Sequence, residues 1–262
     1  MKPLFSVVVT THLRPQLLAR ALGSLKAQTF KDFEIILVSD EPSEETHATA
    51  GHLLDARDVY IRRRGVPGPG ISRNVGLRAA NGEFVLFLDD DDTFEPGMLT
   101  SLAYSGKLDS RVVLYCNAEE IIESRATNPP TPLSSGRANN ADADLQQLMV
   151  TNFLSNNGII VSRHVAMRFG FDESLRCLED WDFLVGLYLH NPFVHVDLFG
   201  PRVHRDKSGV GHRNTYTGPA AGQAALDFLS VYRKWPGRNA AEREKRAEHL
   251  GKWGMRLPAD WL

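Results

Sequence analysis

Apolar runs and helical spacings alternate along the first half of the chain. The runs are short, continuous and rich in β-branched residues, which is typical of strands buried on both faces of a parallel sheet. The segments between them space apolar side chains three and four residues apart, which predicts helices with one buried face. The expected elements are strands at Ser6–Val9, Phe33–Val38, Val59–Ile61 and Phe84–Leu88, and helices from Pro15, over Glu44–Leu54 and over Ser72–Ala80. This alternation predicts an α/β fold with a mostly parallel sheet.

The second half of the chain is less regular. A stretch rich in Pro, Ser, Asn and Ala, Ser124–Asp144, is the best candidate for a mobile loop. The other expected elements are a helix from Pro96, strands at Val112–Tyr115 and Gly158–Val161, a helix over Trp181–Leu189, an extended segment at Pro192–Val196 and a tail helix with the apolar stripe Ala221, Ala225, Phe228, Leu229 and Tyr232. The stripe has helical spacing, so we expect the tail helix to pack on another part of the protein.

Composition places the chain among ordinary globular proteins. It has 262 residues, of which 42% are hydrophobic and 24% charged, and this balance excludes wholesale disorder. The longest apolar runs fall far short of the roughly 20 residues that cross a bilayer. The first residues predict a strand and not a signal peptide. The two cysteines, Cys116 and Cys177, are too few for a disulfide framework and suit a reducing cytoplasm.

Charge is unevenly distributed along the chain. The formal net charge is −2, whereas the residues from Arg202 onward hold 12 Lys and Arg against 6 Asp and Glu. A basic tail on an acidic body favours contact with phosphate or with an anionic membrane surface. The alternative is a solvated helical face, because acidic residues interleave with basic ones between Glu242 and Glu248. No nucleic acid is expected as a partner, since no recognition motif accompanies the short run Arg62–Arg64.

Four consecutive aspartates, Asp89–Asp92, directly follow a strand that we expect to be buried. Ligands of open α/β sheets bind at the carboxyl ends of the strands, so these carboxylates point toward the usual binding crevice. Alternation in an extended segment places Asp89 and Asp91 on one side and Asp90 on the other. Oxygen ligands of this kind suit Mg²⁺ or Mn²⁺ shared with a substrate phosphate. The alternative is an acidic turn in which the last aspartate or Thr93 caps the next helix.

Three further segments carry candidate binding or reactive residues. Glu179–Asp182 holds three acids at the start of a predicted helix. The helix dipole stabilises carboxylates in the first turn, and we assign that structural role to two of the three acids. The third is a candidate general base. Asp40 ends the second strand, where it forms an Asx turn or binds a ligand. Arg73 and Asn74 open a helix behind a glycine-rich loop, a position that favours an anion. That loop matches neither the dinucleotide fingerprint nor a P-loop, which are the motifs that usually indicate hydride transfer and ATP hydrolysis. It therefore favours neither activity.

These motifs lie in the order in which one known family carries them. Over about residues 5–205 they are Ser6–Arg14, Asp40, Arg73-Asn74 with Gly82-Glu83, Leu88–Asp92, Gly170–Ser174 and Glu179–Asp182. Together they resemble the family 2 glycosyltransferases. The resemblance implies the GT-A fold, a Rossmann-like three-layer sandwich around a mixed, mostly parallel sheet. It also implies an inverting transfer of a sugar from a nucleotide-diphosphate donor to an acceptor hydroxyl.

The resemblance implies roles for residues on the donor side. Asp40 matches the acid that binds the nucleotide base, usually the N3–H of uracil. Asp89 matches the residue near the ribose, and Asp90 shares that contact. The other implied nucleotide-sugar contacts are Thr10, Thr11, Arg14, Arg73 and Asn74.

The same resemblance implies a metal ion and a base. Asp91 matches the carboxylate that holds Mn²⁺ or Mg²⁺ at the diphosphate, and Asp180 matches the catalytic base. His204 resembles a histidine that completes the metal shell in some members. The implied parts are a nucleotide-sugar-binding half at 1–115, an acceptor-binding half with the base at 116–204 and a basic helical tail or lid at 205–262.

The chain departs from the common family pattern after the second strand. Many members have two aspartates followed by Gly-Ser, whereas Ser39–Ser43 keeps one aspartate and lacks the glycine. The implied base contact therefore rests on Asp40 alone. The expected partners are a UDP-sugar and a glycan or lipid-linked acceptor of polysaccharide biosynthesis. The expected location is the cytoplasm, with peripheral contact at the inner face of the membrane through the basic tail.

The sequence is compatible with two other functions. One is a nucleotide-sugar-binding scaffold without catalysis, although such a protein needs no base such as Asp180 opposite the leaving group. The other is a sugar-1-phosphate nucleotidyltransferase. That class is expected to carry a glycine-rich N-terminal loop, and Thr10–Arg14 contains no glycine.

Overall fold

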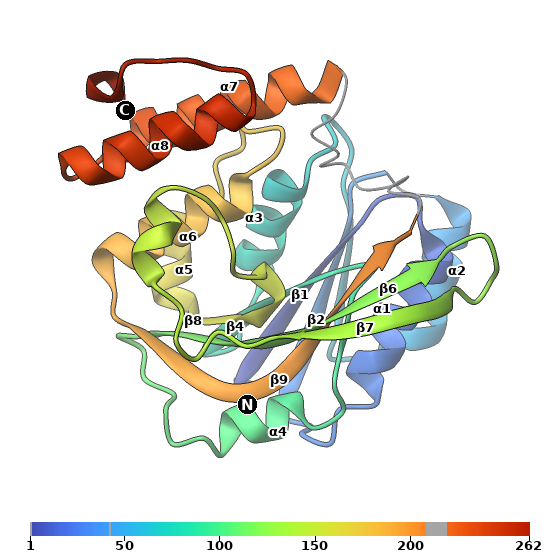
Figure 1. The fold of residues 1–262 in the computed structure, drawn as a ribbon. Coiled ribbons are helices and arrows are strands. Elements are labelled where there is room, and N and C mark those ends of the chain that lie inside the picture. Colours follow the sequence, from blue (N-terminus) through green and yellow to red (C-terminus); the bar gives the residue numbers. More distant parts are fainter. Residues whose placement is uncertain (1, 42, 208–218) are drawn as a thin grey trace.

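The computed structural model describes residues 2–41, 43–207 and 219–262, which fold around one nine-stranded sheet (Figure 1). The strands are β1 (Phe5–Thr11), β2 (Phe33–Ser39), β3 (Val59–Arg62), β4 (Phe84–Asp89), β5 (Thr93–Phe94), β6 (Val113–Ser124), β7 (Thr131–Ala138), β8 (Ile159–Ser162) and β9 (Phe193–Asp206). The helices are α1 (Pro15–Lys26), α2 (Glu44–Leu53), α3 (Pro69–Ala79), α4 (Met98–Ala103), α5 (Arg163–Phe169), α6 (Glu179–His190), α7 (Pro219–Lys234) and α8 (Ala240–Lys252). The strand order is β3-β2-β1-β4-β8-β6-β9-β5, and β7 pairs with β6.

Four neighbouring strands, β3, β2, β1 and β4, run parallel, as the alternation in the sequence predicts. Their carboxyl ends therefore meet at one edge of the sheet. The register sets Thr10 beside Asp89 and Thr11 beside Ser39. In the other half, β8 pairs antiparallel with β4 and β6, and β6 runs parallel to β9. The expected mixed sheet is confirmed.

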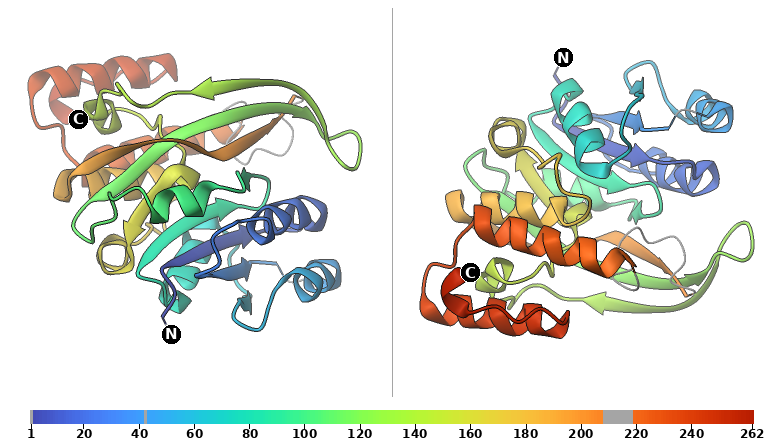
Figure 2. Two further views of the ribbon diagram at one scale, coloured as in Figure 1. Left: turned by 90° about the horizontal axis from the view of Figure 1, so that it is seen from below. Right: turned by 90° about the horizontal axis from the view of Figure 1, so that it is seen from above.

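Apolar clusters cover both faces of this sheet and explain its three layers. On one face, Val7 and Val9 pack with Leu22 of α1. On the other face, Val8 packs with Leu77 of α3. Successive side chains of a strand point to opposite faces, so the apolar run of β1 serves both layers. Figure 2 shows helices on either side of the sheet, and the expected three-layer α/β arrangement is confirmed.

Gly82 lies where the chain enters β4 beside β1. A Cβ atom at this position would lie 2.5 Å from the backbone nitrogen of Ser6, which is closer than van der Waals contact allows. The Gly82 N–H instead donates to the Ser6 hydroxyl at 2.7 Å. Close backbone approach therefore accounts for the glycine of this motif.

The expected mobile loop over Ser124–Asp144 is wrong for its middle part. Thr131–Ala138 forms β7, which pairs antiparallel with β6. Every residue of β7 is exposed, so the strand lacks the apolar signal by which strands are predicted. Strand β6 continues to Ser124, past the expected end at Tyr115, because it pairs with β7 and β9 along its outer half.

Two helices begin elsewhere than expected. Helix α3 begins earlier, at Pro69, where a proline suits the first turn because its missing N–H would have no helical partner. Helix α4 begins at Met98, and its N-cap residue, Gly97, has no side chain to cap it. Neither Asp92 nor Thr93 caps it, and the alternative of an acidic capping turn is therefore wrong.

The tail helices pack on α6, as the apolar stripe predicts. Trp181 of α6 contacts Phe228 and Tyr232 of α7, with ring centroids 5.2 and 5.6 Å apart. Arg246 of α8 is fully buried, and its guanidinium donates to main-chain carbonyl oxygens at 2.7 and 2.8 Å. The tail is thus joined to the α/β body by a shared core.

Some expectations fall on residues outside the described set. These are Pro42 of the proposed Asx turn, the side chain of Ala221 in the stripe and 208–218 of the expected lid. The expected division after residue 115 falls inside β6, and the one after residue 204 falls inside β9. The two expected halves therefore share strands of one sheet.

Candidate functional site

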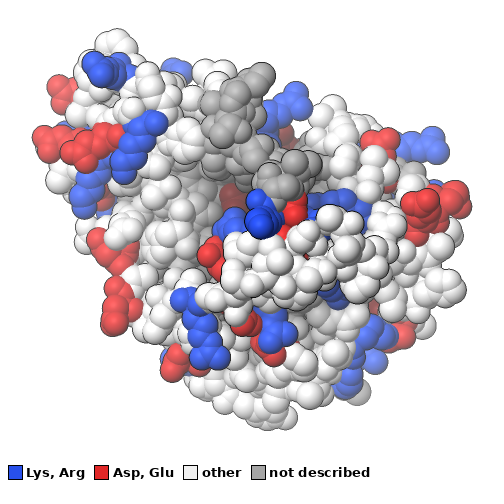
Figure 3. Space-filling model, turned by 45° about the vertical axis from the view of Figure 1, so that its right-hand side comes forward, with Lys and Arg blue, Asp and Glu red and all other residues white. Residues whose placement is uncertain are grey.

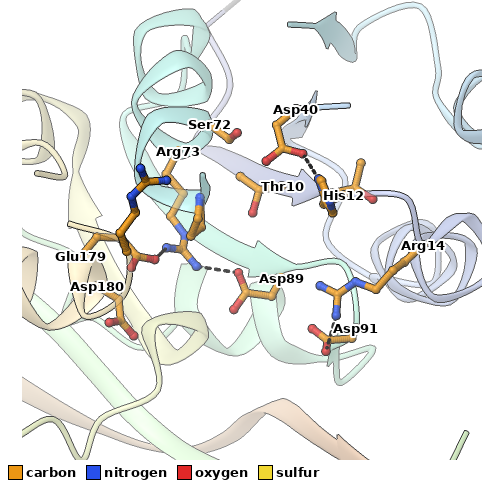
Figure 4. A pocket seen from close by; sticks show the side chains of 13 residues that line it. Thr10, His12, Arg14, Asp40, Ser72, Arg73, Asp89, Asp91, Glu179 and Asp180 are labelled. Carbon is orange, nitrogen blue, oxygen red and sulfur yellow. Dashed lines mark hydrogen bonds and ion pairs between the residues drawn. The ribbon is translucent and has the colours of Figure 1, made fainter. Parts of the chain in front are cut away.

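A cavity of about 170 Å³ lies at the carboxyl edge of the parallel strands. The ends of β1, β2 and β4, the start of α3 and the start of α6 form its wall (Figure 4). It is lined by Thr10, Thr11, His12, Arg14, Asp40, Pro69, Ser72, Arg73, Asp89, Asp91, Arg176, Glu179 and Asp180. The fold thus brings together every predicted site residue except Asn74, Asp90 and His204.

Asp89 and Asp91 both face this cavity, as predicted. The expected extended segment is wrong, however, because Asp89–Asp92 forms a turn in which the Asp92 N–H donates to the carbonyl oxygen of Asp89 at 3.1 Å. Asp89 pairs with Arg73 at 2.7 Å. Oδ2 of Asp91 accepts hydrogen bonds from Arg14 at 3.0 Å and from Arg125 at 3.2 Å. Its Oδ1 has no hydrogen-bond partner within the described ranges. Arginines therefore supply the positive charge that this acidic run requires in the free protein.

Asp90 and Asp92 point into the protein and are buried. Asp90 accepts a hydrogen bond from Thr11 at 2.7 Å and pairs with Arg14. Burial raises the pKa of Asp90 to about 6. Asp92 accepts the main-chain N–H of His204 at 2.7 Å, and burial together with the neighbouring aspartates raises its pKa. Both carboxylates hold the turn, and Asp90 reaches a ligand only when its partners move.

Arg73 joins the two acidic segments. Its side chain is only 5% exposed and donates to Asp89 at 2.7 Å and to Glu179 at 2.5 Å. The guanidinium lies over the ring of Phe171, 5.4 Å from the centroid. Burial raises the pKa of Glu179 to about 7, although the charge of Arg73 opposes the shift. This buried pair fixes the start of α6 against the end of β4.

Two acids at the start of α6, Glu179 and Asp180, line the cavity (Figure 4), and Asp180 is the one that is not paired with a basic side chain in the described residues. Glu179 is held by the arginine just described, and Asp182 accepts from Lys234 at 2.7 Å. Asp180 accepts a longer hydrogen bond from Asn152, at 3.3 Å. Burial raises its pKa, so its carboxylate is a stronger base than an exposed aspartate.

Asp40 lies across the cavity from Asp180 (Figure 4). Its Oδ1 is 2.6 Å from Nδ1 of His12, and its Oδ2 accepts the N–H of Gly68 at 3.0 Å. Asn74 lies outside the lining. Its amide donates to the carbonyl oxygen of Phe171 at 2.8 Å, so it joins α3 to the chain that precedes α6.

His204 is buried behind the acidic run and does not line this cavity. Its Nδ1 is 3.0 Å from Glu123, and its Nε2 is 3.0 Å from the hydroxyl of Thr93. Among the described residues, no three His, Cys, Asp or Glu side chains form a group that could hold a metal ion. Oδ1 of Asp91, which has no hydrogen-bond partner within the described ranges, is available as one ligand of a cation. Phosphate and water would then supply the other ligands.

A second cavity, of about 310 Å³, adjoins the first. Asp89, Asp91 and Asp180 line both cavities and therefore stand between them. The sequence carries no motif for the wall of the second cavity or for the arginine on Asp91. The residues missed for this reason are Arg125, Asn140, Asn152, Phe153, Asn156 and Asn157.

Comparisons with known proteins agree with this geometry. The profile of the family described as Glycosyl transferase family 2 matches residues 6–173. One relative is the GalNAc(5)-diNAcBac-PP-undecaprenol beta-1,3-glucosyltransferase of Campylobacter jejuni, 40% identical over 103 residues. That match covers 38% of this chain and 33% of the relative, so the chain aligns with only a third of that protein's length.

Two solved structures have a similar fold. S. aureus TarS 1-349 in complex with UDP-GlcNAc has a TM-score of 0.67 at 21% identity, over 95% of this chain and 72% of that one. The mannosyltransferase PcManGT from Pyrobaculum calidifontis, in complex with GDP-Man and Mn²⁺, has a TM-score of 0.60 at 14% identity, over 99% of this chain and 78% of that one. No helix within the described part of the chain is long and apolar enough to cross a membrane.

The buried pair at Arg73 yields a prediction about stability. Substitution Arg73→Met leaves Glu179 buried without its cation, and we expect a loss of about 3–5 kcal/mol in the free energy of unfolding. The pKa of Glu179 in the folded protein is already above its ordinary value of 4.5, so stability falls as the pH rises between these values. Without Arg73 the pKa of Glu179 rises further. The free energy of unfolding of Arg73→Met is therefore further below that of wild type at pH 8 than at pH 6. Chemical denaturation at both pH values measures the difference.

The control for this substitution is Arg62→Met, which removes an exposed pair with Glu44. We expect a change below about 1 kcal/mol there. Equal losses in both variants, or a deficit of Arg73→Met that does not grow with pH, would contradict the assigned role of Arg73.

Proposed function

The chain belongs to glycosyl transferase family 2, and on this basis we propose that it transfers one sugar from a nucleotide-diphosphate donor to a saccharide hydroxyl with inversion. One observation carries the proposal. Asp89, Asp91 and Asp180 line both of two adjoining cavities. We assign the first cavity to the donor and the second to the acceptor. A base on the acceptor side, opposite a site for the leaving diphosphate, is the arrangement that a single displacement requires.

The first cavity takes the nucleotide part of the donor. Asp40 accepts the N3–H of uracil, which makes a UDP-sugar the proposed donor. Asp89 contacts the ribose, as do Thr10 and Thr11 at the end of β1. Arg14 offers its guanidinium to the diphosphate, since arginine forms strong bidentate contacts with phosphate.

Two other residues predicted to contact the donor, Asp90 and Asn74, instead hold neighbouring residues in position in this proposal. Asp90 holds Thr11 and Arg14 in place through its hydrogen bonds. Asn74 holds the segment at Phe171 on which Arg73 stacks.

A divalent cation, Mn²⁺ or Mg²⁺, is the proposed cofactor. Asp91 would hold it, and His204 would contribute a ring nitrogen once freed from its contact with Thr93. Such an ion supplies Lewis-acid stabilisation of the negative charge on the leaving diphosphate. The unpartnered Oδ1 of Asp91 and its place beside the cavity support this assignment.

Asp180 is the proposed catalytic base. The acceptor hydroxyl gives its proton to Asp180 while its oxygen forms the new bond to the anomeric carbon. The bond from that carbon to the diphosphate oxygen breaks, and its electron pair leaves with the nucleoside diphosphate. Attack and departure lie on opposite faces of the sugar, so the configuration inverts. The raised pKa of Asp180 supports its role, because a stronger base takes the proton more readily.

The proposed acceptor is a glycan or a lipid-linked saccharide. The Campylobacter relative is named for a substrate on PP-undecaprenol, which supports a lipid-linked acceptor and a role in polysaccharide biosynthesis. A lipid-linked acceptor places the protein in the cytoplasm at the inner face of the membrane. Exposed basic residues of the tail, Lys245, Lys252 and Arg256, would make that contact. Acidic side chains lie among the basic ones on the tail at the upper left of Figure 3, so the contact is expected to be weak.

Charge reversal tests the membrane contact. Each Lys or Arg near an anionic surface contributes about 1 kcal/mol. We therefore expect Lys245→Glu, Lys252→Glu and Arg256→Glu, combined, to abolish flotation with vesicles containing phosphatidylglycerol. The matched control reverses three exposed arginines elsewhere, Arg57, Arg78 and Arg111, and should float as the wild type does. Equal flotation of both triple variants would exclude the tail as the contact.

Substitution of the base tests the reaction. We expect Asp180→Asn to lower kcat by about 10²–10⁴-fold, because the acceptor proton then has no base. Affinity for the nucleotide sugar, measured by calorimetry, should not change. The control is Asp182→Asn, which loses the contact with Lys234 and therefore lowers the melting temperature while kcat stays close to that of wild type. Transfer by Asp180→Asn at the wild-type rate would refute the assignment of Asp180 as the base. Donor binding without transfer by the wild type would instead favour the non-catalytic scaffold.

Ligand-induced stabilisation tests the donor class and the cation together. A ligand at about 100 times its Kd stabilises the folded state by about 2.7 kcal/mol. We expect UDP to raise the melting temperature more with Mn²⁺ than without it, and Asp91→Asn to lose only the increment due to Mn²⁺. Asp109→Asn, at an exposed acid paired with Arg111, is the control. An Mn²⁺ increment of equal size in Asp91→Asn would show that the cation binds elsewhere.

A further inference from the structure

Asn156 has a buried amide group with no partner. The residue is 3% exposed, and neither its Oδ1 nor its Nδ2 forms a hydrogen bond within residues 2–41, 43–207 and 219–262. An unsatisfied buried polar group costs about 1–3 kcal/mol. An apolar side chain of similar size would avoid that cost, so the protein keeps the amide at the expense of its own stability.

The next residue shows the contrast within the same turn. Asn157 is equally buried, but its Oδ1 accepts the N–H of Asp89 at 3.3 Å and its Nδ2 donates to Asp92. Asn157 therefore supports the acidic run, as a structural asparagine does. The side chain of Asn156 has no such role toward the described residues, and the hydrogen-bonding capacity of its amide is unused.

Asn156 is one of the residues that line the second cavity, as are Asp91 and Asp180. Both amide atoms are buried in the free protein, so a ligand in the cavity reaches them only when neighbouring side chains shift. A volume of about 310 Å³ lies within the range of small-ligand pockets, roughly 300–1,000 Å³. Phe153 and Leu154 give this wall an apolar surface beside the amides of Asn140 and Asn152. The rest of the wall is polar and includes carboxylates. A polar wall with an apolar patch suits a pyranose ring, which has an apolar face and a rim of hydroxyl groups.

The geometry of a carboxamide narrows the ligand chemistry. Its oxygen accepts and its nitrogen donates from neighbouring positions in one plane, as when asparagine binds the adjacent N6 and N7 of adenine. Two hydroxyl groups on neighbouring ring carbons match this pair, because one donates to Oδ1 while the other accepts from Nδ2. The N–H and C=O of a single acetamido group point in opposite directions and cannot both reach one carboxamide.

We propose that Asn156 is a specificity-determining residue that binds two neighbouring hydroxyl groups of the acceptor pyranose beside Asp180. This inference rests on the proposed function, since it places the acceptor in the second cavity. It makes the acceptor class a sugar with a free vicinal diol. It also explains why the fold retains a buried amide that contributes nothing to its own stability.

The test uses Asn156→Leu in the full chain. The probes are methyl β-glucoside, methyl β-galactoside and methyl α-mannoside, each titrated by NMR in the presence of UDP and Mn²⁺. We expect the wild type to bind at least one glycoside and Asn156→Leu to bind it roughly 10- to 100-fold more weakly, because two hydrogen bonds are lost. The deoxy analogue lacking one hydroxyl of the pair should bind the wild type more weakly but be nearly insensitive to the substitution. Such non-additivity is the signature of a direct contact.

Thermal unfolding separates this role from a structural one. We expect the melting temperature of ligand-free Asn156→Leu to equal or exceed that of wild type, since an unsatisfied amide is removed. Asn157→Leu, which loses two hydrogen bonds, should melt lower. Unchanged glycoside affinity in Asn156→Leu, a lowered melting temperature without a selective loss of affinity, or no binding of any of the three glycosides by the wild type would each overturn the inference.

Measuring UDP binding in the same samples distinguishes a failure of this inference from a failure of the proposed function. A wild-type protein that binds UDP but whose Asn156→Leu variant binds glycosides normally refutes the role of Asn156 alone. A wild-type protein that is not stabilised by UDP refutes the donor assignment itself.

Discussion

One buried ion pair network holds the candidate site together. Arg73 reaches from α3 to Asp89 at the end of β4 and to Glu179 at the start of α6, and it stacks on Phe171. Arg73 thereby joins two acidic segments, at Asp89 and at Glu179, that are 90 residues apart in the chain. Because Asp180 follows Glu179 directly, Arg73 also sets the distance between the proposed base and the acidic run. Removing one partner of such a pair leaves a buried charge uncompensated, so its cost exceeds that of a surface ion pair.

The rest of the site follows from the turn that Asp89–Asp92 forms at the end of β4, which the Asp92 N–H closes by donating to the carbonyl oxygen of Asp89. Asp90 and Asp92 turn inward and bind the protein, whereas Asp89 and Asp91 turn outward and bind arginines. In the free protein, guanidinium groups hold the position at which a cation and a diphosphate are proposed to bind. Arg14 contacts both Asp90 and Asp91, so it is placed to exchange a carboxylate partner for a phosphate. The acidic run is therefore balanced before any ligand arrives.

Much of this arrangement is predictable from the sequence, because buried parallel strands and their acidic ends leave strong local patterns. The strands at Phe84–Leu88 and Phe33–Val38 follow from their apolar runs alone, and Asp89 lies at the cavity because its strand ends there. The position of Asp91 depends on the turn that follows, which the apolar run does not predict. Strand β7 does not, because every one of its residues is exposed and pairing with β6 replaces an apolar signal.

Contacts across the fold are the other part that local patterns miss. Arg125 reaches Asp91 only because β6 extends to Ser124, and nothing near Arg125 in the chain marks that contact. The side-chain amide of Asn156 is distinguished by having no hydrogen-bond partner among the described residues, which only a three-dimensional structure reveals. His204 was expected near a metal, whereas both of its ring nitrogens contact protein groups that lie far away in the sequence.

A crystal structure of the protein with UDP and Mn²⁺, recorded at the manganese absorption edge, tests the central claim most directly. We expect an anomalous peak bound by Asp91 and by oxygens of the diphosphate, with uracil beside Asp40 and Arg14 turned toward phosphate. A nucleotide bound outside the cavity at the ends of β1 and β4, or manganese bound away from Asp91, would contradict the account.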